Sequence, residues 1–269
     1  MKGSKEKDMV EGTLSERDRA EIERSAEEAR RTIFAGIDRS QINRYLDPPA
    51  DTAYALEYAF YLLGDIRGKT VLDLGCGTGE NLVPLVERGA RVIGIDLSPD
   101  LVALARLRVR NAGVEAELRV ASAYDTGLES GSVDIVFCIA LIHHLDIRRV
   151  RDEMRRILAE GGVVILKEPV RFSKIYAFLR GLLPAQENVS EFEHPLTQQE
   201  LATMTEPFEV QELRYFRLPW IPLVTSVFPS MEHTMWRLDR WVFRHCNLAK
   251  HLATAVAMRL VNHDGGSSQ

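Results

Sequence analysis

Apolar and polar positions along the middle of the chain follow two periods in turn, which predict strands and helices. Short apolar runs bounded by turn residues predict strands at Thr70–Leu74, Arg91–Ile95, Glu117–Ala121, Val133–Leu141 and Val163–Lys167. Apolar residues at helical spacing predict intervening helices at Asn81–Arg88, Pro99–Asn111 and Ile147–Ala159. Strands that alternate with helices form right-handed crossovers, so we expect an α/β fold of the Rossmann type with a doubly wound, mostly parallel sheet.

The two flanks of this region are less regular. The charged stretch Glu16–Arg31 predicts an exposed helix that is either simply solvated or a cap over an active site. Beyond it we expect helices at Asp51–Leu63, Phe172–Leu183, Leu196–Met204 and Met231–Cys246, and strands at Phe208–Phe216 and Ala253–Val261. The predicted organisation is a helical and flexible N-terminal segment (1–48), a cofactor-binding core (49–169), a C-terminal substrate lid with the last strands (170–261) and a flexible tail (262–269).

A glycine-rich turn joins the first predicted strand to the next helix, in the segment Val71–Glu80. Such a turn lets a nucleotide approach the backbone closely. A dinucleotide site favours Gly or Ala where this chain has Glu80, and Asp73 precedes the first glycine by two positions. Carboxylates repel a pyrophosphate but attract the sulfonium and ammonium groups of S-adenosylmethionine. The turn therefore favours S-adenosylmethionine over a nicotinamide dinucleotide.

A second acidic residue, Asp96, ends the strand that follows the turn. Its place, about 20 residues beyond the glycines, is where ribose hydroxyls lie in nucleotide-binding sheets. A carboxylate there can accept hydrogen bonds from both hydroxyls. The alternative is an N-cap for the next helix, although Ser98 or Asp100 can supply that cap instead.

The stretch Thr70–Pro169 resembles the class I S-adenosylmethionine-dependent methyltransferases that act on small molecules. The resemblance rests on the sequences VLDLGCGTG and IGIDLSP and on the turn Ile157–Gly162. It implies a seven-stranded sheet with an antiparallel last strand, S-adenosylmethionine as cofactor at the carboxyl ends of the first strands, and Leu97 packed on the adenine. The implied cofactor-binding residues are Asp73, Gly75, Cys76, Gly77, Thr78, Gly79, Asp96, Leu97, Ser122, Ala123 and Ile139.

The chain departs from the family pattern after the third strand. Family members often carry Gly-Asp-Ala there, and this chain carries Ala121-Ser122-Ala123. Ser122 can still hydrogen-bond the adenine, but without a charge, and Asp125 is the alternative partner.

Three side chains are candidates for the chemistry of methyl transfer. His143 and His144 follow the fourth strand, where a histidine can act as general base or only shape the pocket. Glu168 follows the fifth strand and can bind an amine, take a proton or form a structural salt bridge. His194, in the predicted lid, is a weaker candidate.

Composition and length of apolar runs restrict the class of methyl acceptor and the cellular location that we expect. The formal net charge of −5 gives no reason to expect nucleic-acid binding, and three dispersed cysteines without a CxxC pair predict neither a metal site nor disulfides. The N-terminus has no secretory signal and no apolar run is long enough to span a bilayer, so we expect a cytoplasmic protein. Seven large residues after Pro169 either line an apolar pocket or form core: Trp220, Phe228, Met231, Met235, Trp236, Trp241 and Phe243.

These observations favour a small apolar or amphipathic acceptor, with the methylated atom left open between oxygen, nitrogen and carbon. Two other functions stay in view. One is a non-catalytic S-adenosylmethionine-binding protein. The other is a nicotinamide-dependent oxidoreductase, which the carboxylates of Asp73 and Glu80 disfavour. The sequence says nothing of the oligomeric state.

Overall fold

A single mixed sheet organises the computed structural model, which describes residues 19, 22–27, 38–172 and 194–262. Its seven strands run in the order β3-β2-β1-β4-β5-β7-β6, and only β7 is antiparallel to its neighbours. The strands are β1 (Thr70–Leu74), β2 (Arg91–Asp96), β3 (Glu117–Val120), β4 (Val133–Ile139), β5 (Leu158–Pro169), β6 (Glu209–Phe216) and β7 (Ala255–Val261). This confirms the expected doubly wound, mostly parallel sheet with an antiparallel last strand.

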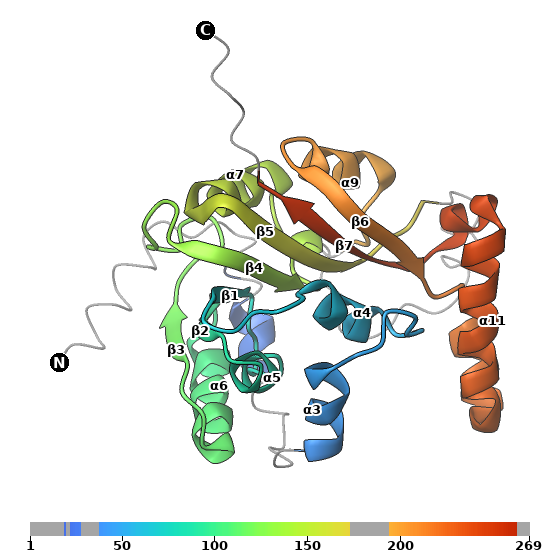
Figure 1. Cartoon of the computed structure of the whole chain (residues 1–269), viewed down its shortest axis with the longest axis horizontal. Coiled ribbons are helices and arrows are strands. Elements are labelled where there is room, and N and C mark those ends of the chain that lie inside the picture. The colour runs from blue at the N-terminus through green and yellow to red at the C-terminus, as the bar shows by residue number, and fades with distance from the viewer. Residues whose placement is uncertain (1–18, 20–21, 28–37, 173–193, 263–269) are drawn as a thin grey trace, which may run out of the picture.

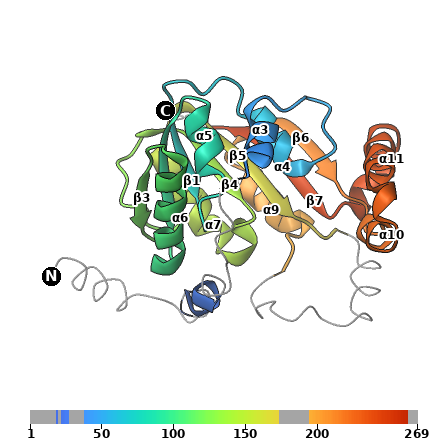
Figure 2. The same cartoon turned by 90° about the horizontal axis from the view of Figure 1, so that it is seen from below.

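Helices cover both faces of the sheet (Figure 1). On one face lie α4 (Ala55–Leu62), α5 (Leu82–Glu87) and α6 (Pro99–Ala112), packed around fully buried Phe60 and Phe137. On the other face lie α7 (Ile147–Ile157) and α9 (Gln198–Thr205), packed around Met154 and Met204 (Figure 2). Alternate residues of each strand serve the two cores, so the central strands are apolar on both faces.

Side-chain caps set where several helices begin. Ser98 caps α6 by accepting a hydrogen bond from the Leu101 N–H, and Gly113 in the left-handed conformation ends that helix. Asp146 caps α7, and Thr197 forms a reciprocal capping box with Glu200 at the start of α9. Because Ser98 supplies the cap of α6, the alternative capping role for Asp96 is not used.

The structure corrects the predicted element boundaries near the site. β4 ends at Ile139, two residues earlier than predicted, because Ala140 has a φ of 54° and Ile142–His144 form a 3-10 turn. β5 begins at Leu158, directly after α7, with an irregular register before Val163. The sequence pattern indicated a helix to Ala159 and a strand from Val163, because Gly161 and Gly162 suggested a turn between them.

Two helices were not predicted, and one prediction lies outside the described residues. The unpredicted helices are α3 (Arg39–Leu46) and α10 (Ile221–Val227). α3 has one buried residue, Ile42, so its apolar signal is weak. The helix predicted at 172–183 falls almost wholly on residues that are not described. The helix α11 (Glu232–His245) and the 3-10 segment Asn247–Leu252 complete the link from β6 to β7.

Candidate active site

A cavity of about 430 Å³ opens at the carboxyl edge of the sheet. Four segments from different strands line it: Leu74–Thr78 after β1, Ile95–Ser98 at the end of β2, Ala121–Tyr124 after β3, and Ile139–Leu141 with His144 and Leu145 after β4. In an open α/β sheet, ligands bind where these strand ends meet. The cavity therefore collects the residues that the sequence predicted for cofactor binding.

The glycine turn forms one wall of the cavity. Gly75 has a φ of 75°, and a Cβ built on it would come within 2.8 Å of the Leu141 side chain. Gly77 has a φ of 51° with no atom close to its Cβ position, so its open side faces free space. The N–H groups of Gly75 and Cys76 both donate to the Ile95 carbonyl, at 2.8 and 2.9 Å. These bonds hold the turn against β2.

Asp96 joins the turn to the end of β2. Its Oδ2 accepts a hydrogen bond from the Gly77 N–H and its Oδ1 accepts one from the Ser98 N–H, each at 2.9 Å. Each carboxylate oxygen can accept two hydrogen bonds. Asp96 thus organises the turn itself and also lines the cavity.

Asp73 lies directly behind this wall, only 1% exposed. Neither of its carboxylate oxygens accepts a hydrogen bond from any residue that the structure describes. Burial, followed by the negative charge of Asp96, raises the pKa of Asp73 to about 7, and the nearby Asn81 side chain, which lines the cavity, opposes this shift. A buried carboxylate with so little hydrogen bonding is costly, because little replaces the water it has lost. It is the kind of group that a cationic ligand would satisfy.

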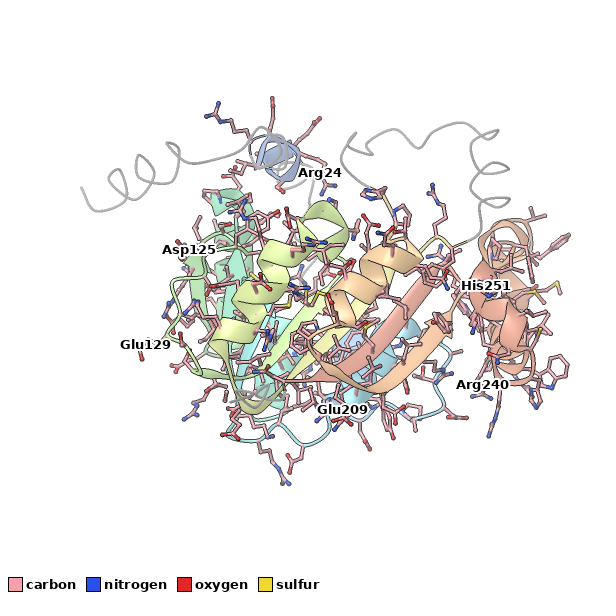
Figure 3. The ribbon with its side chains drawn as sticks, turned by 90° about the horizontal axis from the view of Figure 1, so that it is seen from above. Arg24, Asp125, Glu129, Glu209, Arg240 and His251 are labelled. Carbon is pink, nitrogen blue, oxygen red and sulfur yellow. The ribbon has the colours of Figure 1, made fainter. Side chains whose placement is uncertain are left out.

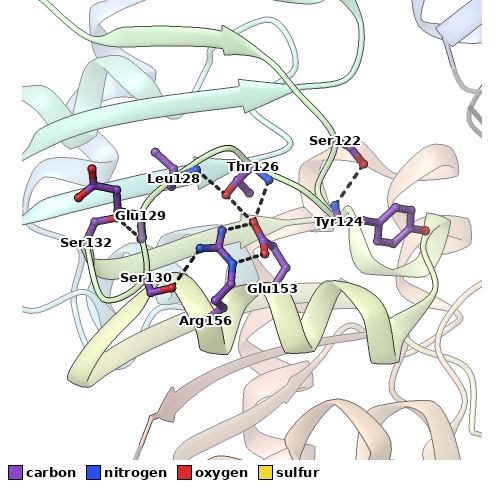
Figure 4. Close-up of polar contacts among 9 residues, drawn as sticks. All are labelled: Ser122, Tyr124, Thr126, Leu128, Glu129, Ser130, Ser132, Glu153 and Arg156. Carbon is purple, nitrogen blue, oxygen red and sulfur yellow. Dashed lines mark hydrogen bonds and ion pairs between the residues drawn. The ribbon is translucent and has the colours of Figure 1, made fainter. Parts of the chain in front are cut away.

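The loop after β3 forms the opposite wall, and a polar network holds it against α7 (Figure 4). Buried Glu153 accepts hydrogen bonds from the Thr126 N–H and hydroxyl and from the Arg156 guanidinium, at 2.6–2.8 Å. Burial raises the pKa of Glu153, but these hydrogen bonds outweigh it, so the pKa is lowered overall. At the cavity end, the Ser122 hydroxyl accepts from the Tyr124 N–H.

The turn after β4 depends on Glu168. This buried carboxylate accepts hydrogen bonds from the Leu141 and Ile142 N–H groups, each at 2.9 Å, and lies 2.8 Å from Nδ1 of His143. Glu168 and His143 are 1% and 6% exposed, and neither is among the residues lining the cavity. His144 does line the cavity, and its ring centroid lies 4.0 Å from that of His143. The three predicted catalytic residues therefore come together, but only His144 reaches the cavity.

Most of the predicted cofactor residues line the cavity. These are Gly75, Cys76, Gly77, Thr78, Asp96, Leu97, Ser122, Ala123 and Ile139. Asp73 and Gly79 lie behind the lining. Burial raises the pKa of the Cys76 thiol, so this residue contributes a small apolar surface and no thiolate. His194 lies outside the lining and pairs with Glu200 at 3.0 Å.

The cover of the cavity comes from the charged N-terminal stretch, for which a cap over the site was one of the two sequence-based alternatives. Ile22, Arg24 and Ser25, on the helical segment 22–27, line it, as does Leu56 from α4 (Figure 3 labels Arg24). Within the described ranges, no residue after Leu145 lines the cavity, so the predicted lid at 170–261 does not form this wall; residues 173–193 of that lid lie outside the described ranges. The charge spacing of 16–31 signalled the helix but not its position.

The described ranges contain no group of three or more His, Cys, Asp or Glu side chains placed to hold a metal ion. Their helices are all too short or too polar to cross a membrane.

Comparison with known proteins matches the same region. Residues 72–166 match the family model described as "Methyltransferase domain". The ubiquinone biosynthesis O-methyltransferase of Pseudomonas paraeruginosa is 36% identical over 115 residues, which are 42% of this chain and 50% of the relative. That of Xanthomonas oryzae pv. oryzae is 38% identical over 104 residues, 38% of this chain and 44% of the relative. The chain spans about half the length of the curated relatives it matches.

Solved structures share the fold over more of the chain. Geranyl diphosphate C-methyltransferase from Streptomyces coelicolor, solved with geranyl diphosphate and S-adenosyl-L-homocysteine, superposes with a TM-score of 0.60 at 17% identity and covers 93% of this chain and 98% of that one. A protein from Pyrococcus horikoshii superposes with a TM-score of 0.56 at 19% identity, covering 88% and 98%. At these identities the likeness shows the fold alone.

Fold, site and family model agree on one class of domain, a methyltransferase domain on a Rossmann-like sheet. The match of residues 72–166 to this domain agrees with the resemblance to class I S-adenosylmethionine-dependent methyltransferases that the sequence motifs indicated.

Proposed function

We propose that this protein transfers a methyl group from S-adenosylmethionine to a small apolar or amphipathic acceptor. The observation that carries the proposal is the Asp73 carboxylate, which is buried behind the glycine turn and accepts no hydrogen bond from the described residues. The ammonium of the cofactor's methionine part would satisfy this charge, directly or through water next to Asn81. A dinucleotide would instead bring phosphates toward Asp73 and Asp96, which like charges disfavour.

The other walls suit the remaining parts of this cofactor. Asp96 lines the cavity with a carboxylate, the kind of group that accepts hydrogen bonds from ribose hydroxyls, and Leu97 and Ala123 offer apolar contact to the adenine. Ser122 offers a hydroxyl in place of the family's frequent aspartate. When bound, the cofactor supplies a methyl group made electrophilic by its sulfonium.

The acceptor side of the cavity is mainly apolar. Leu56, Leu141, Leu145 and Tyr124 line it, with Ile22 on the cover. Such walls exclude water and bind apolar surface, which favours an apolar or amphipathic acceptor. Two similar proteins are named for ubiquinone biosynthesis and for geranyl diphosphate, which agrees with a small-molecule acceptor for this chain.

His144 is the proposed general base. It is the histidine on the lining of the cavity, at the turn after β4. Glu168 and His143 lie behind it, and we assign them a positioning role: Glu168 fixes the backbone of the turn and the ring of His143, against which His144 packs. An acceptor that needs deprotonation would lose its proton to the His144 imidazole.

Calorimetric titration with S-adenosylhomocysteine, and with NADH for comparison, tests the cofactor. We expect micromolar binding of the first ligand alone. Asp96→Ala should weaken it at least about tenfold, on the scale of a lost charged hydrogen bond of roughly 1.5–3 kcal/mol. Asp100→Ala, an exposed position on the first turn of α6 outside the cavity lining, is the matched control and should bind normally.

Turnover then separates the enzyme from a non-catalytic binding protein. Radiolabelled S-adenosylmethionine would be incubated with panels of phenols, amines and prenylated small molecules, and methyl transfer to each would be measured. Transfer that His144→Ala reduces supports the proposal. Tight binding of S-adenosylhomocysteine without transfer to any panel would favour a binding protein, and NADH binding would contradict the cofactor assignment.

A further inference from the structure

The segment between β6 and β7 carries an apolar surface that covers neither the core nor the cavity. We name it the α10–α11 surface and define it by its exposed large apolar residues: Trp220, Val227, Phe228, Met231, Leu238, Trp241 and Leu248. Val227, Trp241 and Leu248 are 67%, 59% and 75% exposed. Most of the exposed large apolar side chains in the described part of the chain belong to this surface. Figure 1 shows α11 standing at one side of the molecule, past the ends of β6 and β7.

This finding corrects, in part, the sequence-based expectation for the seven large residues after Pro169. They were expected to line an apolar pocket or to form core. Of them, Phe243 packs against the main core and Trp236 contacts Tyr54, whereas Trp220, Phe228, Met231 and Trp241 face outward. Helical spacing shows that apolar residues share a face but does not say what that face meets.

Helix α11 is anchored to the body of the protein by a polar residue. Its one buried residue is Asp239, whose carboxylate accepts hydrogen bonds from the Arg217 and Leu218 N–H groups at 2.9 and 2.8 Å. Trp241 lies two residues away, which places it on the opposite side of the helix, about 160° around the axis. The polar residue therefore anchors the helix to the body and the tryptophan points away from it.

Several cationic side chains lie beside Trp241 on this surface. Arg237, Leu238, Trp241 and Arg244 line one shallow hollow, together with Thr234, Arg240 and His245. Between residues 217 and 251 the chain has five Arg or Lys and two acids, in a protein with a net charge of −5. Of the two acids, Asp239 is buried and Glu232 stands at the start of α11. Arg240 pairs with Asp51, but Arg237 and Arg244 face outward beside Trp241 (Figure 3 labels Arg240).

The surface lies at the functional edge of the sheet. β6 and β5 are both antiparallel to β7, and β5 is parallel to β4, so β6 ends at the same edge as β4. The segment with α10 and α11 starts from that edge, where the cavity also opens.

We propose that the α10–α11 surface docks this protein on an anionic lipid bilayer. Tryptophan and arginine combine apolar bodies with polar or charged ends, and such residues on one face of a helix bind the interface between lipid headgroups and acyl chains. Symmetric pairing with a second copy would bring Arg237 and Arg244 of both copies into one interface, with Glu232 as the one exposed acid between residues 217 and 251. A bilayer supplies anionic charge and needs no shape-matched groove.

Docking in this way would hold the cavity edge toward the lipid surface. The proposal does not depend on methyl transfer, since it rests on the surface outside the cavity. If the acceptor is amphipathic, the bilayer would supply it, and the acceptor would reach the cavity from the headgroup region.

Sedimentation of the full chain with lipid vesicles tests the proposal. The probes are vesicles of phosphatidylcholine alone and vesicles with roughly one third phosphatidylglycerol, at low and at high salt. We expect binding to the anionic vesicles that weakens with salt. Arg237→Glu with Arg244→Glu should lower the affinity at least about tenfold, because each lost cation near an anionic surface weakens binding several-fold and reversal adds repulsion. Trp241→Ser with Leu248→Ser should lower it similarly at either salt concentration.

Matched controls carry the same changes elsewhere. Arg110→Glu with Arg148→Glu gives an identical change in net charge at exposed positions on α6 and α7, and Leu107→Ser with Val210→Ser removes exposed apolar groups outside the α10–α11 surface. Both controls should bind vesicles normally, and all variants should keep their affinity for S-adenosylhomocysteine. Equal loss in variants and controls would overturn the proposal, as would no vesicle binding. A dimer in sedimentation equilibrium that Trp241→Ser breaks would assign the surface to a second copy instead.

Discussion

Two buried aspartates in this protein have opposite surroundings. Asp239, in the α10–α11 segment, is 2% exposed and accepts two backbone hydrogen bonds. Asp73, behind the glycine turn, is 1% exposed and accepts none from the described residues. Burial is the largest cause that raises the pKa of each, and for Asp73 it reaches about 7. A satisfied buried carboxylate stabilises a fold, whereas an unsatisfied one destabilises it until a ligand binds.

The buried aspartate therefore has a different role in each of the two regions. In the α10–α11 segment the aspartate fixes a helix from which Leu238 and Trp241 point outward. In the cofactor region the apolar residues are buried, and the aspartate accepts no hydrogen bond from the described residues. Substitutions at the two aspartates should therefore change the free energy of unfolding in opposite directions.

The largest expected effect is on stability, from Asp239→Ala. It leaves the buried Leu218 N–H and the Arg217 N–H without an acceptor, where Arg217 already has a φ of 65°. The free energy of unfolding should fall by about 3 kcal/mol, on the scale of two unsatisfied donors. Urea unfolding would measure it, with Asp239→Asn as the milder variant. Unchanged stability, or a large change in S-adenosylhomocysteine affinity at unchanged stability, would contradict the anchoring role.

The opposite outcome is expected for Asp73→Asn. Replacing an unpaired buried charge by a neutral amide should raise the unfolding free energy of the ligand-free protein at pH 8, by roughly 1–3 kcal/mol. The same change should weaken S-adenosylhomocysteine binding about 30-fold, because the ammonium loses its counter-charge. Thermal unfolding and calorimetry on one preparation measure both. A variant that is less stable than the original protein and binds the ligand equally well would show that Asp73 is structural.

Glu168→Gln tests a third buried carboxylate, which is satisfied like Asp239 but adjoins the cavity. Gln can still accept from the Leu141 or Ile142 N–H but lacks the charge that faces His143. We expect kcat to fall about fivefold with the KM for S-adenosylmethionine changed less than twofold, since the turn shifts while the cofactor walls stay in place. A rise in KM at constant kcat would instead make Glu168 part of the binding surface.

A pH dependence of S-adenosylhomocysteine binding is also expected. Because the pKa of Asp73 is raised from 3.8 to about 7, its carboxylate is mostly ionised at pH 8 and mostly protonated at pH 6. S-adenosylhomocysteine affinity should fall up to about tenfold between these values. The sign for stability is reversed: the native state holds this proton more tightly than the unfolded chain, so the contribution of Asp73 to stability falls as pH rises from about 4 to 7. Both trends should vanish in Asp73→Asn.

Much of the fold and of the cofactor loop could be predicted from the sequence. Strand and helix periods, together with the spacing from Gly75 to Asp96, are local patterns that a chain displays without its tertiary contacts. The misplaced ends of β4 and β5 mark the limit of such patterns. Ala140 adopts a positive φ at a turn that Glu168, 28 positions further along the chain, holds in place. Local propensity does not predict that turn.

The sequence by itself determined the class of domain, the glycine turn and the acidic residues beside it, because these depend on residue types at short fixed spacings. Only the tertiary structure decided which of those acids accepts no hydrogen bond from the described residues, which histidine reaches the cavity, and that residues 22–25 cover it. It also decided that the tryptophan side of α11 faces outward. Burial and hydrogen bonding at each of these positions come from elements far apart in the chain, so the physical reason lies in packing and not in local pattern.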